Sequence, residues 1–225
     1  MRKDKEKALF LRKSGRSYKQ IKEELGIPVS TLSEWLSPHK WSQNIKKSLT
    51  EVAKKENSVR IQSLNNIRGE HLKKLYKEAE IEAIKEFEGL KYHPLFIAGI
   101  MIYWGEGDRV TKHNIRVSNT DPVMIKLFVD FLIKICNAPK NRIKSSLLLY
   151  PDLNDIVCKE YWSKNALIPE NSFNKSIFIT GKHKTKRLQY GVCNTVFTST
   201  YTKRKLLIWL KLLSKEIVSK EYYKI

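Results

Sequence analysis

Residues 96–109 form an apolar run that ends abruptly at a glutamate held between two glycines. The run reads Phe-Ile-Ala-Gly-Ile-Met-Ile-Tyr-Trp before Gly105, Glu106 and Gly107, with no charged side chain ahead of the glutamate. A helix that is apolar on all sides must be buried in a core or against another helix. The glycines let backbone approach a ligand closely, and a carboxylate is costly to bury. The run therefore predicts a packed helix that presents one acid at a functional surface.

The charge of the chain points to a polyanionic partner. The 225 residues suffice for one sizeable core plus a smaller module, at about 100 to 200 residues per domain. Against 23 acidic residues stand 43 lysines and arginines, for a formal charge of +20, which is typical of nucleic-acid binding. The longest apolar runs, 95–105 and 206–213, fall short of the roughly 18 residues that a membrane-spanning helix needs. We expect no membrane partner and a cytoplasmic, nucleoid-associated protein.

The cysteines and histidines argue against zinc chemistry. Cys136, Cys158 and Cys193 lack the spacing of metal ligands, and each lies among apolar or strand-like neighbours. We interpret them as small core residues in a reducing compartment. The five histidines are scattered and form no pair at helical spacing with an acid between them.

The first 40 residues are predicted to form three short helices separated by glycine-containing turns. Gly15 ends the first, and Gly26-Ile27-Pro28 makes the turn between the second and third. Ser17 and Gln20 have the spacing of a capping box at the start of the second helix. The pattern resembles the helix-turn-helix of resolvases and transposases, which predicts a DNA-binding domain over residues 1–40. A helical bundle that binds protein is the alternative.

In such a motif the third helix enters the major groove, and residues near its start reach the base edges. In this chain those residues are Val29, Ser30, Thr31 and Ser33. Residues 41–92 follow with many charges, few glycines and apolar positions at helical spacing, which predicts a connecting helix. Its lysines suit phosphate contacts, although a solvated spacer explains them equally well.

Residues 93–220 have the mixed periodicity of an α+β domain. We expect strands at 114–119, 142–150, 176–180 and 188–198, and helices at 121–136, 154–167 and 202–218. Alternation along the first two strands leaves one apolar face for the core and one polar face for an anion. The polar positions that we assign to DNA are Arg116, Ser118, Arg142 and Lys144.

The helix that ends in Gly105-Glu106-Gly107 resembles the LAGLIDADG motif of homing endonucleases. The resemblance implies a saddle-shaped antiparallel sheet with packed helices. Because the motif occurs once, it also implies a homodimer, with Ala98, Met101, Ile102 and Gly105 at the helix crossing. Glu106 then corresponds to the family's catalytic acid and ligand of Mg²⁺ or Mn²⁺. Basic residues between two of the predicted strands, Lys182, Lys184, Lys186 and Arg187, are further candidates for phosphate contacts.

Two functions follow from this resemblance. The first is a site-specific, divalent-metal-dependent endonuclease for double-stranded DNA, with the helix-turn-helix extending its site. The second is a non-catalytic transcriptional regulator with a degenerate LAGLIDADG core. Trp104 favours the regulator, because it stands where the family often has its first acid. Met101 does so too, since a small residue usually lets the two helices approach there.

Overall fold

The computed structural model describes residues 4–179 and 188–219. The chain divides into two compact units, Met1–His71 and Leu72–Ile225. The division falls inside one long helix, α4 (Lys40–Leu90), which matches the helix expected after residue 40. The predicted domain boundaries at residues 40 and 92 stay predictions. No helix in the described ranges has both the length and the apolar character needed to cross a membrane.

Three short helices precede α4 in the first unit: α1 (Lys5–Lys13), α2 (Tyr18–Leu25) and α3 (Val29–Leu36). The predicted capping box is present, since the Gln20 amide donates to the Ser17 hydroxyl and the Ser17 amide donates to the Gln20 side chain. Gly26 ends α2 with a φ of 67°, a conformation that glycine adopts without strain. The three helices enclose a small core of Ala8, Ile21, Ile27, Leu32 and Leu36.

A buried arginine attaches the start of α4 to these helices. The Arg12 guanidinium donates to the Ser42 hydroxyl at 3.0 Å and to the Ser42 carbonyl at 2.8 Å. It also donates to the Arg16 carbonyl and lies over the Tyr18 ring. Burial lowers the pKa of Arg12, so these acceptors replace the water that the charge has lost. From residue 51 to residue 68, by contrast, all side chains of α4 are exposed.

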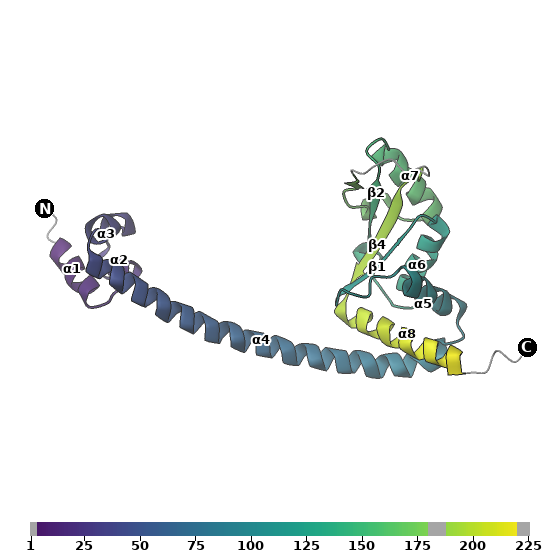
Figure 1. The fold of residues 1–225 in the computed structure, drawn as a ribbon, viewed down its shortest axis with the longest axis horizontal. Helices are drawn as coiled ribbons and strands as arrows, with labels where there is room; N and C mark the ends of the chain where they lie inside the picture. Colours follow the sequence, from purple (N-terminus) through teal and green to yellow (C-terminus); the bar gives the residue numbers. More distant parts are fainter. Residues whose placement is uncertain (1–3, 180–187, 220–225) are drawn as a thin grey trace, which may run out of the picture. The chain divides into compact units, whose positions relative to one another are not determined.

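The second unit is α+β, as predicted (Figure 1). Its helices are the end of α4, α5 (Pro94–Glu106), α6 (Pro122–Lys134), α7 (Asp155–Ala166) and α8 (Thr200–Ser219), with short 3₁₀ turns at Lys140–Arg142 and Glu170–Ser172. Its strands are β1 (Asn114–Asn119), β2 (Lys144–Leu149), β3 (Ile177–Phe178) and β4 (Val192–Thr198). The later strands are shorter than expected. β4 starts at Val192 because Gly191, with a φ of 67°, ends a turn just before it.

The four strands form one mixed sheet in the order β1-β4-β2-β3. β4 pairs antiparallel with both β1 and β2, but β3 runs parallel to β2. The expectation of an antiparallel sheet is therefore wrong at this edge. The reason is α7, which carries the chain back across the sheet between β2 and β3, and such a crossover joins parallel strands. The saddle shape stays a prediction.

One face of the sheet belongs to the core. Ile115, Val117, Leu147 and Leu149 are buried there, and α6 and α7 lie over this face (Figure 1). Alternation along the strands therefore divides apolar from polar side chains as expected. The cysteines are free, and Cys158 and Cys193 are buried as predicted, while Cys136 is partly buried.

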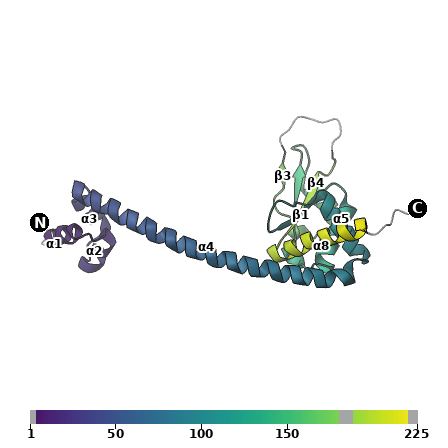
Figure 2. The same ribbon diagram turned by 60° about the horizontal axis from the view of Figure 1, so that its bottom comes forward.

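α8 lies along the last turns of α4 in both views of the ribbon (Figures 1 and 2). The Trp209 indole donates to the Ala83 carbonyl at 3.0 Å. Lys205, nearly buried, donates to the carboxylates of Glu82 and Glu86 at 2.8 Å each. Hydrogen bonds from Lys205, and then from Tyr201, lower the pKa of Glu82 to about 2. The ion pairs of Lys205 and the buried hydrogen bond of Trp209 thus join α8 to this end of α4.

Candidate functional site

The inner face of α5 packs tightly on α6. Phe96, Gly99, Ile100 and Tyr103 are buried at the three- and four-residue spacing of one helix face. A Cβ atom on Gly99 would lie 2.1 Å from Cγ of Phe131, so glycine is what lets the two helices approach. This contact fixes α5 along its length and sets where its last turn emerges.

The outer face of α5 carries the residues predicted for a dimer interface. Ala98, Met101 and Ile102 are half-buried, and Gly105 is exposed with open space around its α-carbon. Trp104 keeps 41% of its surface exposed. A helix without a polar face thus leaves apolar surface uncovered in the described part of one chain, which suits a partner helix. The dimer itself stays a prediction.

Glu106 is the last residue of α5 and is exposed. The Gly107 amide still donates to the Tyr103 carbonyl at 2.9 Å, and the helix ends there because the backbone of Gly107 is extended, with φ −85° and ψ 144°. A Cβ atom at position 107 would lie 2.2 Å from that carbonyl oxygen, so only glycine fits. The chain then pairs with the edge of β1, where the Asp108 amide donates to the Arg116 carbonyl at 3.0 Å. This turn places Glu106 at the border of the sheet.

A polar depression of about 330 Å³ opens beside Glu106. Its lining residues come from the end of α5, from β1 and from β4: Glu106, Gly107, Asp108, Arg116, Ser118 and Asn194. The structure thus brings Glu106 together with Arg116 and Ser118, which the sequence predicts separately. Among the described residues, none forms a hydrogen bond or an ion pair with the Glu106 carboxylate. The acid is available to a ligand.

Asp108, in the same depression, already has partners. Its carboxylate accepts from the Val110 amide, from the amide and hydroxyl of Thr111, and from the Arg116 guanidinium at 3.0 Å. Burial alone would raise the pKa of Asp108, but these hydrogen bonds and the charge of Arg116 outweigh it, and the pKa is lowered. Asp108 therefore organises the turn after Gly107 and holds Arg116 beside Glu106.

A buried lysine fixes the backbone around Glu106 through hydrogen bonds to three acceptors. Lys203 of α8 is only 1% exposed, and its ammonium donates to the Asn114 carbonyl at 3.0 Å, to the Asp108 carbonyl and to the Tyr103 hydroxyl. Burial lowers the pKa of Lys203, while the charge of Asp108 opposes the shift. The three acceptors tie the end of α5 to the start of β1. Lys203 therefore helps to fix the backbone on either side of Glu106.

The site predicted from the sequence leaves out Asp108, and it misses Asn194 and Lys203. The spacing of Lys203 was a usable signal, because it lies on the inward stripe of α8 that continues through Leu206, Trp209 and Leu213. A lysine in such a stripe needs acceptors inside the core. No comparable signal marked Asn194, whose side chain meets Ser118 only through the pairing of β4 with β1.

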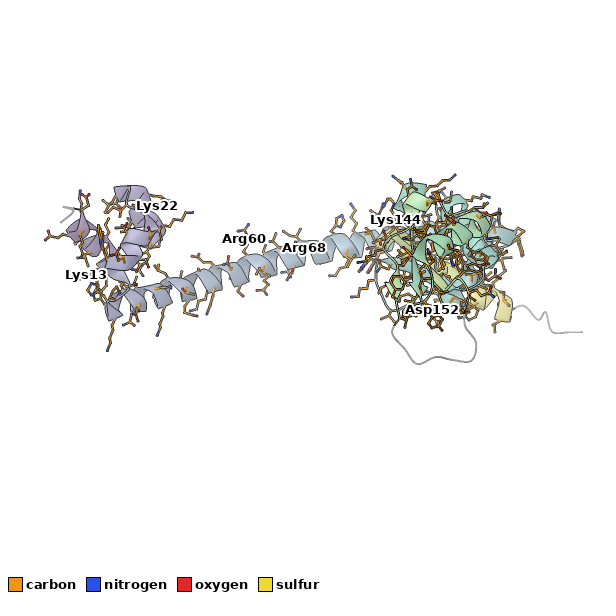
Figure 3. The ribbon with its side chains drawn as sticks, turned by 90° about the horizontal axis from the view of Figure 1, so that it is seen from above. Lys13, Lys22, Arg60, Arg68, Lys144 and Asp152 are labelled. Atoms are coloured by element: carbon orange, nitrogen blue, oxygen red, sulfur yellow. The ribbon has the colours of Figure 1, made fainter. Side chains whose placement is uncertain are left out.

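The open face of the sheet continues the depression with polar and basic groups. Arg116 and Lys144 both stand opposite Val196 in the register, on either side of β4, so their α-carbons lie about 10 Å apart by strand spacing. Arg142 lies in the turn before β2, where it donates to the Thr198 carbonyl at 2.8 Å and lies over the ring of buried Phe197. Lys144 is labelled in Figure 3. Arg116, Ser118 and Lys144 therefore share one face with the depression beside Glu106, whereas nothing places Arg142 there.

The remaining predicted DNA contacts belong elsewhere in the chain. Val29 and Ser30 are exposed at the start of α3, whereas Thr31 and Ser33 are half-buried. The same unit displays Lys13 and Lys22, and Arg60 and Arg68 project from α4 (Figure 3). The predicted basic loop, with Lys182, Lys184, Lys186 and Arg187, lies outside the described residues.

The donors around Glu106 suit a hard cation only in part. Glu106 offers a carboxylate without a protein partner, and Ser118 and Asn194 offer oxygen atoms nearby. Asp108 is already bound by its turn and by Arg116. Within the described ranges, no three acidic, histidine or cysteine side chains gather in a metal-binding group. Magnesium is commonly held by one or two carboxylates together with substrate oxygens and water, and a second copy of the chain can supply a second carboxylate.

Comparisons with protein-family models, with curated proteins and with solved structures found no match. The functional assignment therefore rests on the geometry around Glu106 and on the charge of the chain.

Proposed function

We propose that this protein binds double-stranded DNA as a homodimer and cuts it, as a LAGLIDADG-like endonuclease that depends on a divalent metal. The observation that carries the proposal is the position of Glu106. It is an exposed carboxylate without a protein partner, at the end of an apolar helix, beside an open basic sheet face. Asp108, two residues further on, differs from it, because its carboxylate is held by the turn and by Arg116.

DNA contacts of two kinds support this proposal. Arg116 and Lys144 present cations along the open sheet face, where they suit the regular charges of a phosphate backbone, and Arg142 is exposed in the turn before β2. Ser118 and Asn194 add hydrogen-bonding groups beside Glu106. The three-helix unit, proposed as a helix-turn-helix, adds a second contact through the exposed start of α3. A formal charge of +20 provides the long-range attraction for both.

The outer face of α5 is the proposed dimer contact. Ala98 and Gly105 are small residues one heptad apart on this face, and the space around Gly105 is open. Two copies that pack along this face through a two-fold axis bring their Glu106 carboxylates to the same end of the interface. One acid per chain then becomes a pair.

The reaction proposed for this pair is hydrolysis of a DNA phosphodiester bond. Glu106 of each copy would hold the divalent cation, which supplies an activated water and neutralises charge on the phosphate. Arg116, held beside Glu106 by Asp108, stabilises negative charge that develops on the phosphoryl oxygens. Lys203 and Tyr103 keep the end of α5 in place while the DNA is bound.

A non-cleaving DNA-binding regulator is the second candidate. Trp104 and Met101 favour it, because both are bulky side chains on the part of α5 that would meet the second copy. Bulky residues at a helix crossing hold the two axes further apart. If the axes are too far apart, the two Glu106 carboxylates cannot share a cation, although the sheet can still bind DNA.

One experiment separates the two candidates. Wild type and Glu106→Gln are incubated with a library of DNA duplexes and Mg²⁺, and both binding and nicking are measured. For the endonuclease, Glu106→Gln loses cutting by at least about 100-fold and keeps its affinity, since only the metal-binding charge is gone. Glu56→Gln, at an exposed position of α4, is the matched control and should cut like wild type.

If neither protein nicks any duplex but both bind, the regulator is correct. If neither binds DNA at moderate salt, both proposals are wrong.

A further inference from the structure

A second cavity lies on the side of the sheet away from Glu106. It has a volume of about 300 Å³ and is enclosed by α6, the start of β2 and the segment that follows α7. Its floor is buried and largely apolar, with Ile143, Ala166 and Ile168 each no more than 5% exposed. Val129 and Ile133 of α6 form one wall. A cavity of this size is at the lower end of small-molecule sites, which are mostly apolar with a few polar groups.

The mouth of this cavity carries excess positive charge. Lys126 and Lys134 share a single carboxylate, Asp130, at 3.4 and 3.6 Å. Lys140 adds a third ammonium, exposed and without an ion pair or hydrogen bond among the described residues. Three cations against one acid leave a net attraction for an anion at the entrance.

Backbone strain marks the same entrance. Leu167 ends α7 in the left-handed conformation, with a φ of 54°, where glycine or asparagine is usual. This conformation is strained for a leucine, whose Cβ crowds the neighbouring carbonyl oxygen. Its side chain is nevertheless 64% exposed, so burial within the described part of the chain offsets little of that strain. An apolar group in the cavity would cover the Leu167 side chain.

We propose that this cavity binds a small amphipathic anion: an apolar body of about eight carbons, which the cavity volume accommodates, with one carboxylate. The apolar body lies on Ile143 and Ile168, and the carboxylate faces Lys140. The site is independent of the proposed DNA function. Ile143, just before β2, and Ser145 within it face the cavity, whereas Lys144 between them lies on the open face.

The test is a calorimetric titration of the full chain with acetate, hexanoate and octanoate. Octanoate should bind most tightly, with affinity rising about fourfold for each methylene that is buried. Octylamine has the same chain with the opposite charge, and it should bind at least about tenfold more weakly than octanoate. Methyl NMR of the labelled isoleucines should show the octanoate-induced shifts at Ile133, Ile143 and Ile168.

Lys140→Glu should weaken octanoate binding at least about fivefold, because it reverses the charge at the mouth. Both Lys140 and Lys211 are exposed, so Lys211→Glu on α8 is the matched control and should bind octanoate like wild type. Three results would overturn the proposal: octanoate no tighter than acetate, octylamine equal to octanoate, or equal losses in the two lysine variants. None of these results bears on DNA binding, so the two proposals fail separately.

Discussion

At the scale of single residues, the structure gives two neighbouring acids, Glu106 and Asp108, different surroundings. Glu106 has no partner in the described chain, while Asp108 has four hydrogen-bond donors around its carboxylate. The difference follows from the turn after Gly107, which directs Asp108 back toward Thr111 and Arg116. Glu106 is therefore the candidate for chemistry, and Asp108 is the residue that positions its surroundings.

The hydrogen bonds that Asp108 accepts make the stability of the fold depend on pH, because they favour its charged form. Its folded pKa is lowered, so its carboxylate contributes stability that is complete above its usual pKa of 3.8 and is lost as the pH falls further. Asp108→Asn removes that contribution. The difference in unfolding free energy between wild type and Asp108→Asn should stay constant above about pH 5 and shrink below pH 4.

Urea denaturation between pH 3 and pH 7 measures this difference. Asp121→Asn is a suitable control, since Asp121 caps α6 rather than the turn beside Glu106. A pH-independent difference for Asp108→Asn would show that its hydrogen bonds do not stabilise the charged form.

At the scale of elements, the open sheet face is the surface proposed to lie on DNA. Lys144→Glu reverses one charge at the centre of this face and should weaken DNA binding about tenfold. Because fewer counterions are released, the slope of log affinity against log salt concentration should also be smaller by about one to two. Lys164→Glu is the matched control, because Lys164 is exposed on α7, which packs against the opposite face. Fluorescence anisotropy with a labelled duplex at several salt concentrations measures both effects. Equal losses for the two variants would mean that overall charge, and not this face, governs binding.

The elements also show where prediction from sequence succeeds. β1 has the bounds that its alternation predicts, and the capping box at Ser17 is present, because both signals lie within a few residues. The parallel pairing of β3 with β2 was not predictable in this way. It depends on where α7 returns the chain, and periodicity carries no information about that direction.

The site shows the same limit. The position of Glu106 at the end of α5 follows from the apolar run and its glycines. Lys203 reaches Asp108 and Asn114 from about 90 residues away, so no local pattern connects them. Contacts of this kind appear only when the fold is known.

At the scale of the whole molecule, the proposed nuclease site requires two copies of the chain. One chain supplies a basic sheet and one available carboxylate, and within the described residues it gathers no metal-binding group. The outer face of α5, with Gly105 open to its surroundings, is where a second copy would complete the site. Charge, helix face and acid would then serve the one proposed function, cleavage of bound DNA.

A cross-linking measurement tests this central claim most directly. Gly105→Cys is mixed with duplex DNA under mild oxidation, and covalent dimer is measured by gel electrophoresis. Gly89→Cys is the control, because Gly89 is also exposed with open space around it but lies on α4. The account predicts a disulfide-linked dimer for Gly105→Cys and not for Gly89→Cys, since a disulfide forms only where two α-carbons come within about 7 Å. A Gly105→Cys protein that stays uncrosslinked while bound to DNA would contradict the pairing of α5 helices.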